Sequence, residues 1–308
     1  MPEVKELAGG LLFPEGPVAM NDGSVIVTEI ARGTITRVTP DGKTEVVAET
    51  GGGPNGAAVG PDGKLYVCNN GKAFDYVDLE GMMFPVQPPT AYEGGRIERV
   101  DIDSGSVEVI YSECDGRPLR APNDIVFDAH GGFWFTDHGL REEFTSDRTA
   151  LYYAQPDGSQ IREVVRPLDA PNGIGLSPDG TRLYAAETYT ACVWWWPVTG
   201  PGVVEPEQGL LPHNGQLLTR LPGFQFIDSL AIDGDGNVCL ATLGSGGITV
   251  VSPDDGSVVE FVETGDLLTT NICFGGEGLR TAYITLSGTG RLGQAEWSRA
   301  GLELAHAA

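Results

Sequence analysis

Short apolar runs broken by turn residues follow one another along the whole chain. Typical runs are "VIVTE" (25–29), "KLYVCNN" (64–70) and "RLYAAE" (182–187), and Asp-Gly or other Gly-containing turns lie beside them. Runs of this length and composition between turn signals predict β-strands. The 44 Gly and 21 Pro of the 308 residues also suit many short strands better than a few long helices.

One pattern of two strands around a turn recurs six times. The three closest copies, at 54–70, 122–138 and 171–187, open with Pro-Asn, continue as an apolar strand, turn, and end on a polar or acidic residue. Looser copies lie at 14–29, 227–242 and 270–285. A second pair of strand-like runs follows most copies. The repeat is therefore about four strands in roughly 40–70 residues, which is typical of a propeller blade.

These repeats predict an all-β fold, a six-bladed β-propeller of four-stranded antiparallel blades. We expect it to form a single domain over residues 1–308. The N-terminal "EVKELAG" (3–9) is expected to supply the outer strand of the last blade, because this would close the ring and protect its free edges. A β-helix or a pair of β-sandwiches also has regular short strands but accounts less well for the four-strand unit.

The first polar residue of every copy occupies the same register. The six are Glu15, Asn55, Asn123, Asn172, Asp228 and Asn271. Because the innermost strand of each blade lines the channel, we expect these side chains to meet at one mouth. Carboxylate and amide oxygens are costly to bury unpaired, and they are the ligands that hard divalent cations prefer. An Asn at such a position can also serve only to cap a turn, but a turn does not require the charge of Glu15 or Asp228.

Five motifs together resemble one known family. They are "FPEGP" (13–17), "APND" (121–124), "APNGI" (170–174), "IDSLAID" (227–233) and "NICFGG" (271–276). The chain is similar in these motifs to the senescence marker protein/gluconolactonase/luciferin-regenerating enzyme family of six-bladed propellers. The resemblance implies one divalent cation bound by Glu15, Asn123, Asn172 and Asp228. A ring without His or Cys favours Ca²⁺, with Mg²⁺, Mn²⁺, Fe²⁺ or Zn²⁺ as alternatives.

The resemblance implies hydrolysis of a lactone, either a sugar acid lactone or another small cyclic ester. The cation would polarise the carbonyl, and Asp228 would act as both ligand and general base. The same ring resembles that of diisopropyl fluorophosphatase, so phosphotriesterase or arylesterase activity is an alternative. A third reading is a non-enzymatic propeller that binds a ligand or protein and uses the cation to hold the channel together.

Five further residues are expected to contact the substrate: Asn55, Arg120, Asn271, His138 and Phe84. Sugar lactonases of the family often carry an Arg where this chain has Ala121, and Arg120 stands one place earlier. His138 ends a strand in the third repeat and can face the channel mouth. Phe84 belongs to the long insertion 72–95, whose aromatic residues predict a lid for a partly hydrophobic substrate.

The net charge of −24 limits the choice of partners. Such a surface repels phosphate backbones and anionic lipids, so we expect a small-molecule substrate and neither nucleic acid nor a membrane as partner. Five scattered cysteines without a CxxC pair argue against a disulfide framework and a thiolate zinc site. The N-terminus does not resemble a signal peptide, and no apolar run approaches the roughly 20 residues of a membrane span. We therefore expect a cytoplasmic protein; the sequence predicts no oligomeric state.

Overall fold

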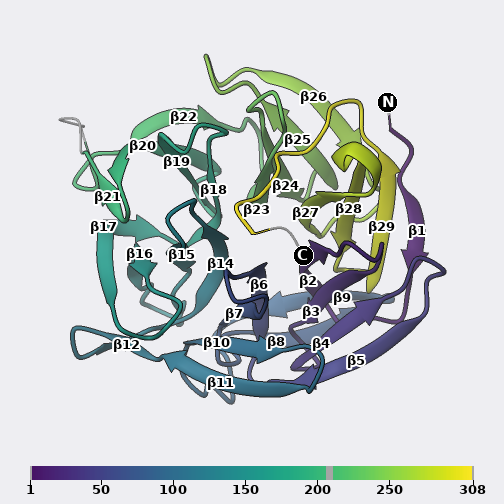
Figure 1. Cartoon of the computed structure of the whole chain (residues 1–308), viewed down its shortest axis with the longest axis horizontal. Helices are drawn as coiled ribbons and strands as arrows, with labels where there is room; N and C mark the ends of the chain where they lie inside the picture. The colour runs from purple at the N-terminus through teal and green to yellow at the C-terminus, as the bar shows by residue number, and fades with distance from the viewer. Residues whose placement is uncertain (1, 206–210, 307–308) are drawn as a thin grey trace.

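The computed structural model describes residues 2–205 and 211–306 (Figure 1). This part of the chain is built almost entirely of strands, with a single 3-10 turn at Glu277–Leu279. Six antiparallel sheets stand around a central axis (Figure 1), so the predicted six-bladed β-propeller is confirmed. No helix within the described ranges is long and apolar enough to cross a membrane.

Each blade runs from an innermost strand at the axis to an outer strand at the rim. The first contains β2 (Pro14–Ala19), β3 (Val25–Glu29), β4 (Thr34–Val38) and β5 (Thr44–Glu49). The second contains β6 (Pro54–Val59), β7 (Leu65–Asn69), β10 (Arg96–Asp101) and β11 (Ser106–Tyr111). The third contains β14 (Pro122–Phe127), β15 (Phe133–Asp137), β16 (Arg148–Ala154) and β17 (Ile161–Asp169).

The last three blades include the one departure from four strands. The fourth contains β18 (Pro171–Leu176), β19 (Arg182–Glu187), β20 (Cys192–Gly200) and β22 (Gln216–Arg220), with the short β21 (Val203–Val204) added on β20. The fifth contains β23 (Phe226–Ile232), β24 (Val238–Leu243), β25 (Gly247–Val251) and β26 (Val258–Glu263). The sixth contains β27 (Thr269–Gly275), β28 (Thr281–Leu286), β29 (Arg291–Glu296) and β1 (Lys5–Ala8).

Both ends of the chain build the sixth blade. Strand β1 pairs antiparallel with β29, with Lys5 opposite Gln294, as the N-terminal segment predicted. The pairing satisfies backbone groups that would otherwise lie open along β29, so the ring has no exposed seam there. Two small hairpins lie outside the blades: β8 (Asp75–Leu79) with β9 (Met82–Val86), and β12 (Glu113–Cys114) with β13 (Arg117–Pro118).

The hydrophobic core is divided among the contacts between neighbouring blades. Between the third and fourth blades, for example, Trp134, Leu151, Leu183 and Trp196 are fully buried in one cluster. All five cysteines are free, which agrees with the expectation of no disulfide framework. Packing of successive sheets therefore holds the inner strands in place around the axis.

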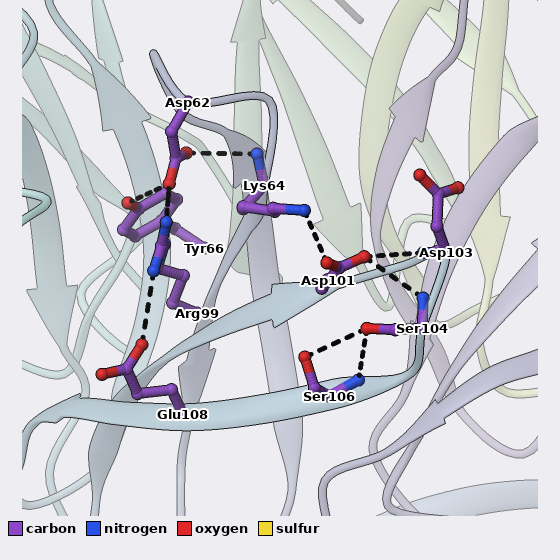
Figure 2. Close-up of polar contacts among 9 residues, drawn as sticks. All are labelled: Asp62, Lys64, Tyr66, Arg99, Asp101, Asp103, Ser104, Ser106 and Glu108. Atoms are coloured by element: carbon purple, nitrogen blue, oxygen red, sulfur yellow. Dashed lines mark hydrogen bonds and ion pairs between the residues drawn. The ribbon is translucent and has the colours of Figure 1, made fainter.

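The Asp-Gly turns that mark the repeat close through the aspartate side chain. Asp62 accepts a hydrogen bond from the backbone N–H of Lys64, two residues on, and Asp22 and Asp179 do the same in their blades. On the second blade Asp62 also pairs with Arg99, and Lys64 pairs with Asp101 (Figure 2). Ion pairs exposed to this degree contribute about 0–1 kcal/mol each, so they order the turns more than they stabilise the fold.

Candidate active site

A β-bulge interrupts each innermost strand at the aligned polar residue. The register shifts lie between Glu15 and Val18, Pro54 and Ala57, Pro122 and Ile125, Pro171 and Ile174, Ile227 and Leu230, and Thr269 and Asn271. A bulge turns a side chain out of the regular alternation and bends the strand. The innermost strands contact one another in sequence around the axis, and β27 meets β2. The bulges therefore present all six residues at one level of the channel.

In four blades the last residue of the second strand anchors the segment ahead of the bulge. A buried side-chain oxygen accepts a backbone N–H in each: Glu29 from Leu12, Asn69 from Gly53, Asp137 from Arg120 and Ala121, and Glu187 from Asp169. Burial raises the pKa of Asp137, and these backbone hydrogen bonds oppose that shift. The polar residue that ends each of these second strands therefore holds the backbone segment that leads into the innermost strand.

Threonine hydroxyls on the second strands connect the ring residues of adjacent blades. Thr28 donates to the carbonyl of Asn55 at 2.7 Å, and Thr136 donates to the carbonyl of Asn172 at 2.6 Å. Thr136 also accepts the backbone N–H of Asp124 at 3.0 Å. One buried hydroxyl thus fixes the ring segments of the third and fourth blades to each other.

Replacing Thr136 with valine is expected to lower the free energy of unfolding by about 1–3 kcal/mol, because a buried N–H and a buried carbonyl lose their partner while the side-chain shape is kept. Urea unfolding followed by tryptophan fluorescence measures the change. Thr44→Val, at an exposed position of β5, is the matched control and should change stability by less than about 0.5 kcal/mol. Equal effects of the two substitutions would show that the Thr136 hydroxyl does not hold the ring.

Five of the six aligned residues lie at one cavity of about 470 Å³: Glu15, Asn55, Asn123, Asn172 and Asp228. The first four are nearly inaccessible, with exposed fractions of 2–5%. Asp228 is the partly exposed member of the five. Asp228 therefore keeps more accessible surface than the other four residues.

Asn271, the sixth aligned residue, is turned away from this cavity. Its amide Nδ2 donates to Glu15 Oε2 at 2.8 Å, and its Oδ1 accepts the backbone N–H of Ile272 at 2.8 Å. It lines a second cavity of about 300 Å³ along the same inner strands, which the C-terminal residues 302–305 also line. Asn271 therefore positions the Glu15 carboxylate, and it does not line the cavity at which the other five aligned residues lie.

Of the other residues expected to contact the substrate, two line this cavity and Arg120 does not. Arg120 does not line the 470 Å³ cavity; its guanidinium pairs with Asp147 at 2.8 Å. His138 and Phe84 do line it. The His138 ring lies edge-on to Phe74, and its Nδ1 is 3.2 Å from the carbonyl of Gly139. Burial lowers the pKa of His138 to about 4, so its imidazole is neutral at pH 7.

Glu15 and Asp228 are the two acidic side chains of the ring at the cavity floor. Burial raises the pKa of both carboxyl groups, and repulsion by Glu15 raises that of Asp228 further. Beside them, the buried Oδ1 of Asn123 has no hydrogen-bond partner. A divalent cation would relieve the repulsion and give the orphaned oxygen a partner, so the donor set fits such an ion. Within the described ranges no three His, Cys, Asp or Glu side chains form a metal-binding group, so any site here must use amide oxygens.

The insertion 72–95 forms the roof of the cavity. Its hairpin β8–β9 places Tyr76 and Phe84 on the cavity wall. The Tyr76 ring packs against Phe13 with 4.9 Å between ring centroids, and the backbone N–H of Met83 donates to the carbonyl of Gly288 at 2.7 Å. The roof is thus fastened to the first and sixth blades.

Comparison with known proteins agrees with this geometry. Residues 13–288 match the family described as SMP-30/Gluconolactonase/LRE-like region. The chain belongs to this family. The match begins two residues before Glu15 and includes all six bulged strands.

Two proteins similar to this chain carry lactonase names. Gluconolactonase of Zymomonas mobilis is 27% identical over 92% of this chain and 79% of its own length. Lactonase drp35 of Staphylococcus saprophyticus is 29% identical over 77% of this chain and 65% of its own length, so the chain spans about two thirds of that relative. The calcium-binding protein regucalcin of Agrobacterium tumefaciens superposes with a TM-score of 0.73 at 16% identity, covering 99% of this chain and 98% of that one, a likeness of fold alone.

Sequence reasoning missed Asp124 as a neighbour of the ring. Burial and the charge of Glu15 raise the pKa of Asp124 to about 8, and its carboxylate accepts the backbone N–H groups of Ile125 and Ile174. The signal was present in the repeat, because the family motif "PNG" at 54–56 and 171–173 reads "PND" in the third blade. Tyr189 on the cavity wall was also missed, and it had no comparable repeat signal.

Proposed function

We propose that the protein hydrolyses lactones at this cavity with a divalent cation bound by Glu15, Asn123, Asn172 and Asp228. The observation that carries the proposal is the meeting of two buried carboxyl groups with raised pKa values and one unpartnered amide oxygen at the cavity floor. Family membership and the lactonase names of the two relatives support the reaction type. Oxygen-only ligands favour Ca²⁺, and the name of the similarly folded regucalcin supports this choice.

When bound, the cation would polarise the lactone carbonyl and stabilise negative charge on its oxygen. Asn271 keeps the Glu15 carboxylate in place through its 2.8 Å hydrogen bond. Asn172 is held from two sides, because its carbonyl accepts from Thr136 and its Nδ2 donates to Thr188 Oγ1 at 3.1 Å. The protein therefore supplies a rigid floor against which the lactone ring is oriented.

Asp228 is assigned the role of general base. Its carboxylate, at the cavity, removes a proton from water as the water oxygen bonds to the carbonyl carbon. The ring C–O bond then breaks, and the proton passes from Asp228 to the leaving alkoxide. The product is the open hydroxy acid, and Asp228 is returned to its starting state.

A panel of esters with defined cations tests the proposal. Metal-free protein is assayed by pH indicator against aldonolactones, aliphatic and aromatic lactones, aryl esters and phosphotriesters, with Ca²⁺, Mg²⁺, Mn²⁺, Fe²⁺ or Zn²⁺ added separately. We expect lactone hydrolysis to depend on the cation and to be highest with Ca²⁺. Turnover of phosphotriesters or aryl esters without lactones would replace the proposal by the alternative hydrolase. A cation that raises the melting temperature while no ester reacts would indicate a structural role.

A further inference from the structure

We propose that the cavity selects uncharged lactones that carry an apolar substituent, in preference to polyhydroxylated sugar lactones. This inference rests on the proposed lactone hydrolysis and assigns its substrate class. It is drawn from the cavity wall above the ring, which is distinct from the carboxylate and amide floor.

Aromatic side chains dominate that wall. Phe74, Tyr76 and Phe84 come from the insertion 72–95, while Tyr189 and Phe226 face the cavity from the fourth and fifth blades. All five are partly exposed, so apolar surface remains for a substrate to cover. Aliphatic residues of the first, fifth and sixth blades complete the wall, including Ile30, Leu243 and Leu268.

The polar side chains of the wall are few, and part of their hydrogen-bonding capacity is already used within the protein. Gln87 Nε2 donates to the carbonyl of Ala73 at 3.0 Å, and Thr188 accepts from Asn172 at 3.1 Å. Three buried atoms of these lining residues have no partner, the hydroxyl of Tyr76, Gln87 Oε1 and Arg141 Nε, and each can serve one polar group of a substrate. The several hydroxyls of a sugar lactone would each lose water and find few partners here, which is unfavourable.

The wall also offers no free charge to an ionic substrate. Arg141 is the one lysine or arginine among the described residues that line the cavity. Its guanidinium pairs with Asp169 at 2.9 Å and lies 3.5 Å from the centroid of the Tyr189 ring. His138 is neutral at pH 7 because burial lowers its pKa to about 4. A carboxylate on the substrate would therefore have no unpaired cationic side chain on the wall.

A series of lactones with the same six-membered ring tests the selection. The probes are glucono-δ-lactone, δ-valerolactone, δ-octalactone and δ-decalactone, and each kcat/KM is divided by the rate constant for hydroxide-catalysed hydrolysis of the same compound. Full burial of a methylene group corresponds to about a fourfold gain. With part of the chain buried, we expect δ-decalactone to exceed both valerolactone and gluconolactone by about 10- to 100-fold.

The outcomes separate this inference from the proposed function. If gluconolactone equals or exceeds the alkyl lactones after normalisation, the inference is wrong while lactonase activity stands. If no lactone in the series reacts in the presence of any cation, the proposed function itself fails and the inference fails with it.

Phe84→Ala tests the roof directly, with Phe144→Ala as the matched control because Phe144 is 88% exposed and does not line the cavity. Phe84→Ala should reduce the normalised advantage of δ-decalactone over δ-valerolactone by about fivefold or more, and Phe144→Ala should leave it unchanged. Calorimetric binding of two unreactive lactams, piperidin-2-one and 6-pentylpiperidin-2-one, gives a readout independent of turnover. Equal affinity of the wild-type protein for both lactams would overturn the inference.

Discussion

Asp228→Asn is expected to lower kcat for lactone hydrolysis by about 10²- to 10⁴-fold, the usual contribution of a positioned general base. An amide has nearly the same shape but cannot take a proton from water. The measurement is kcat at saturating cation, so that weaker cation binding does not contribute to the loss. Circular dichroism should show an unchanged fold, because Asp228 is partly exposed and the substitution removes charge without removing volume.

Asp235→Asn is the matched control for this experiment. Asp235 lies in the exposed turn that follows the same strand, β23, and the identical chemical change there should leave kcat within about twofold of wild type. A wild-type kcat in Asp228→Asn at saturating cation would show that another group starts the attack. Equal losses in both variants would indicate a general effect on the fifth blade.

Glu15→Gln is expected to remove most of the dependence of stability on the cation. In metal-free protein the buried carboxyl groups of Glu15 and Asp228 repel each other, so chelation should lower the wild-type melting temperature by about 5–10 °C. The glutamine variant lacks that repulsion. Its metal-free form should melt above metal-free wild type, and chelator should shift it by less than about 2 °C. Differential scanning calorimetry with and without chelator measures both changes.

The melting temperature of metal-free Glu15→Gln relative to metal-free wild type separates cation binding from simple packing. A residue that merely packs in the channel would destabilise the protein when replaced, with or without cation. Glu49→Gln, at an exposed position of β5, is the control and should retain the full response to chelator. If metal-free Glu15→Gln melts below metal-free wild type and responds to chelator as wild type does, Glu15 does not bind the cation.

The repeat register predicted the ring because the innermost strands of a propeller are equivalent by the fold. Glu15 and Asp228 are more than 200 residues apart in sequence. Each nevertheless lies near the start of the innermost strand of its blade, β2 or β23. The register gave the level of each residue along the channel but could not give the rotation of its side chain. Asn271 shows the limit, because its side-chain amide bonds to Glu15 and to the backbone N–H of Ile272, and the residue does not line the 470 Å³ cavity.

The repeat pattern could not predict contacts made by the loops and insertions between strands. Arg120 was predicted from its nearness in sequence to a family position, but its side chain pairs with Asp147 from the loop after β15. Tyr189 lies just after β19, where no repeat or motif marks it, and only the assembled blades bring it to the cavity with the hairpin β8–β9. The aromatic content of the insertion did predict the apolar roof, since such residues need a surface to cover.

Hydrolysis of δ-valerolactone by metal-free wild-type protein, followed as Ca²⁺ is titrated in, tests the central claim most directly. The account predicts a rate near background at the start and a hyperbolic rise that fits one site. In Glu15→Gln the same curve should move to at least about tenfold higher Ca²⁺, because a charged ligand has been lost. Full hydrolysis by the metal-free protein, unchanged by Ca²⁺ in wild type and variant alike, would contradict the account.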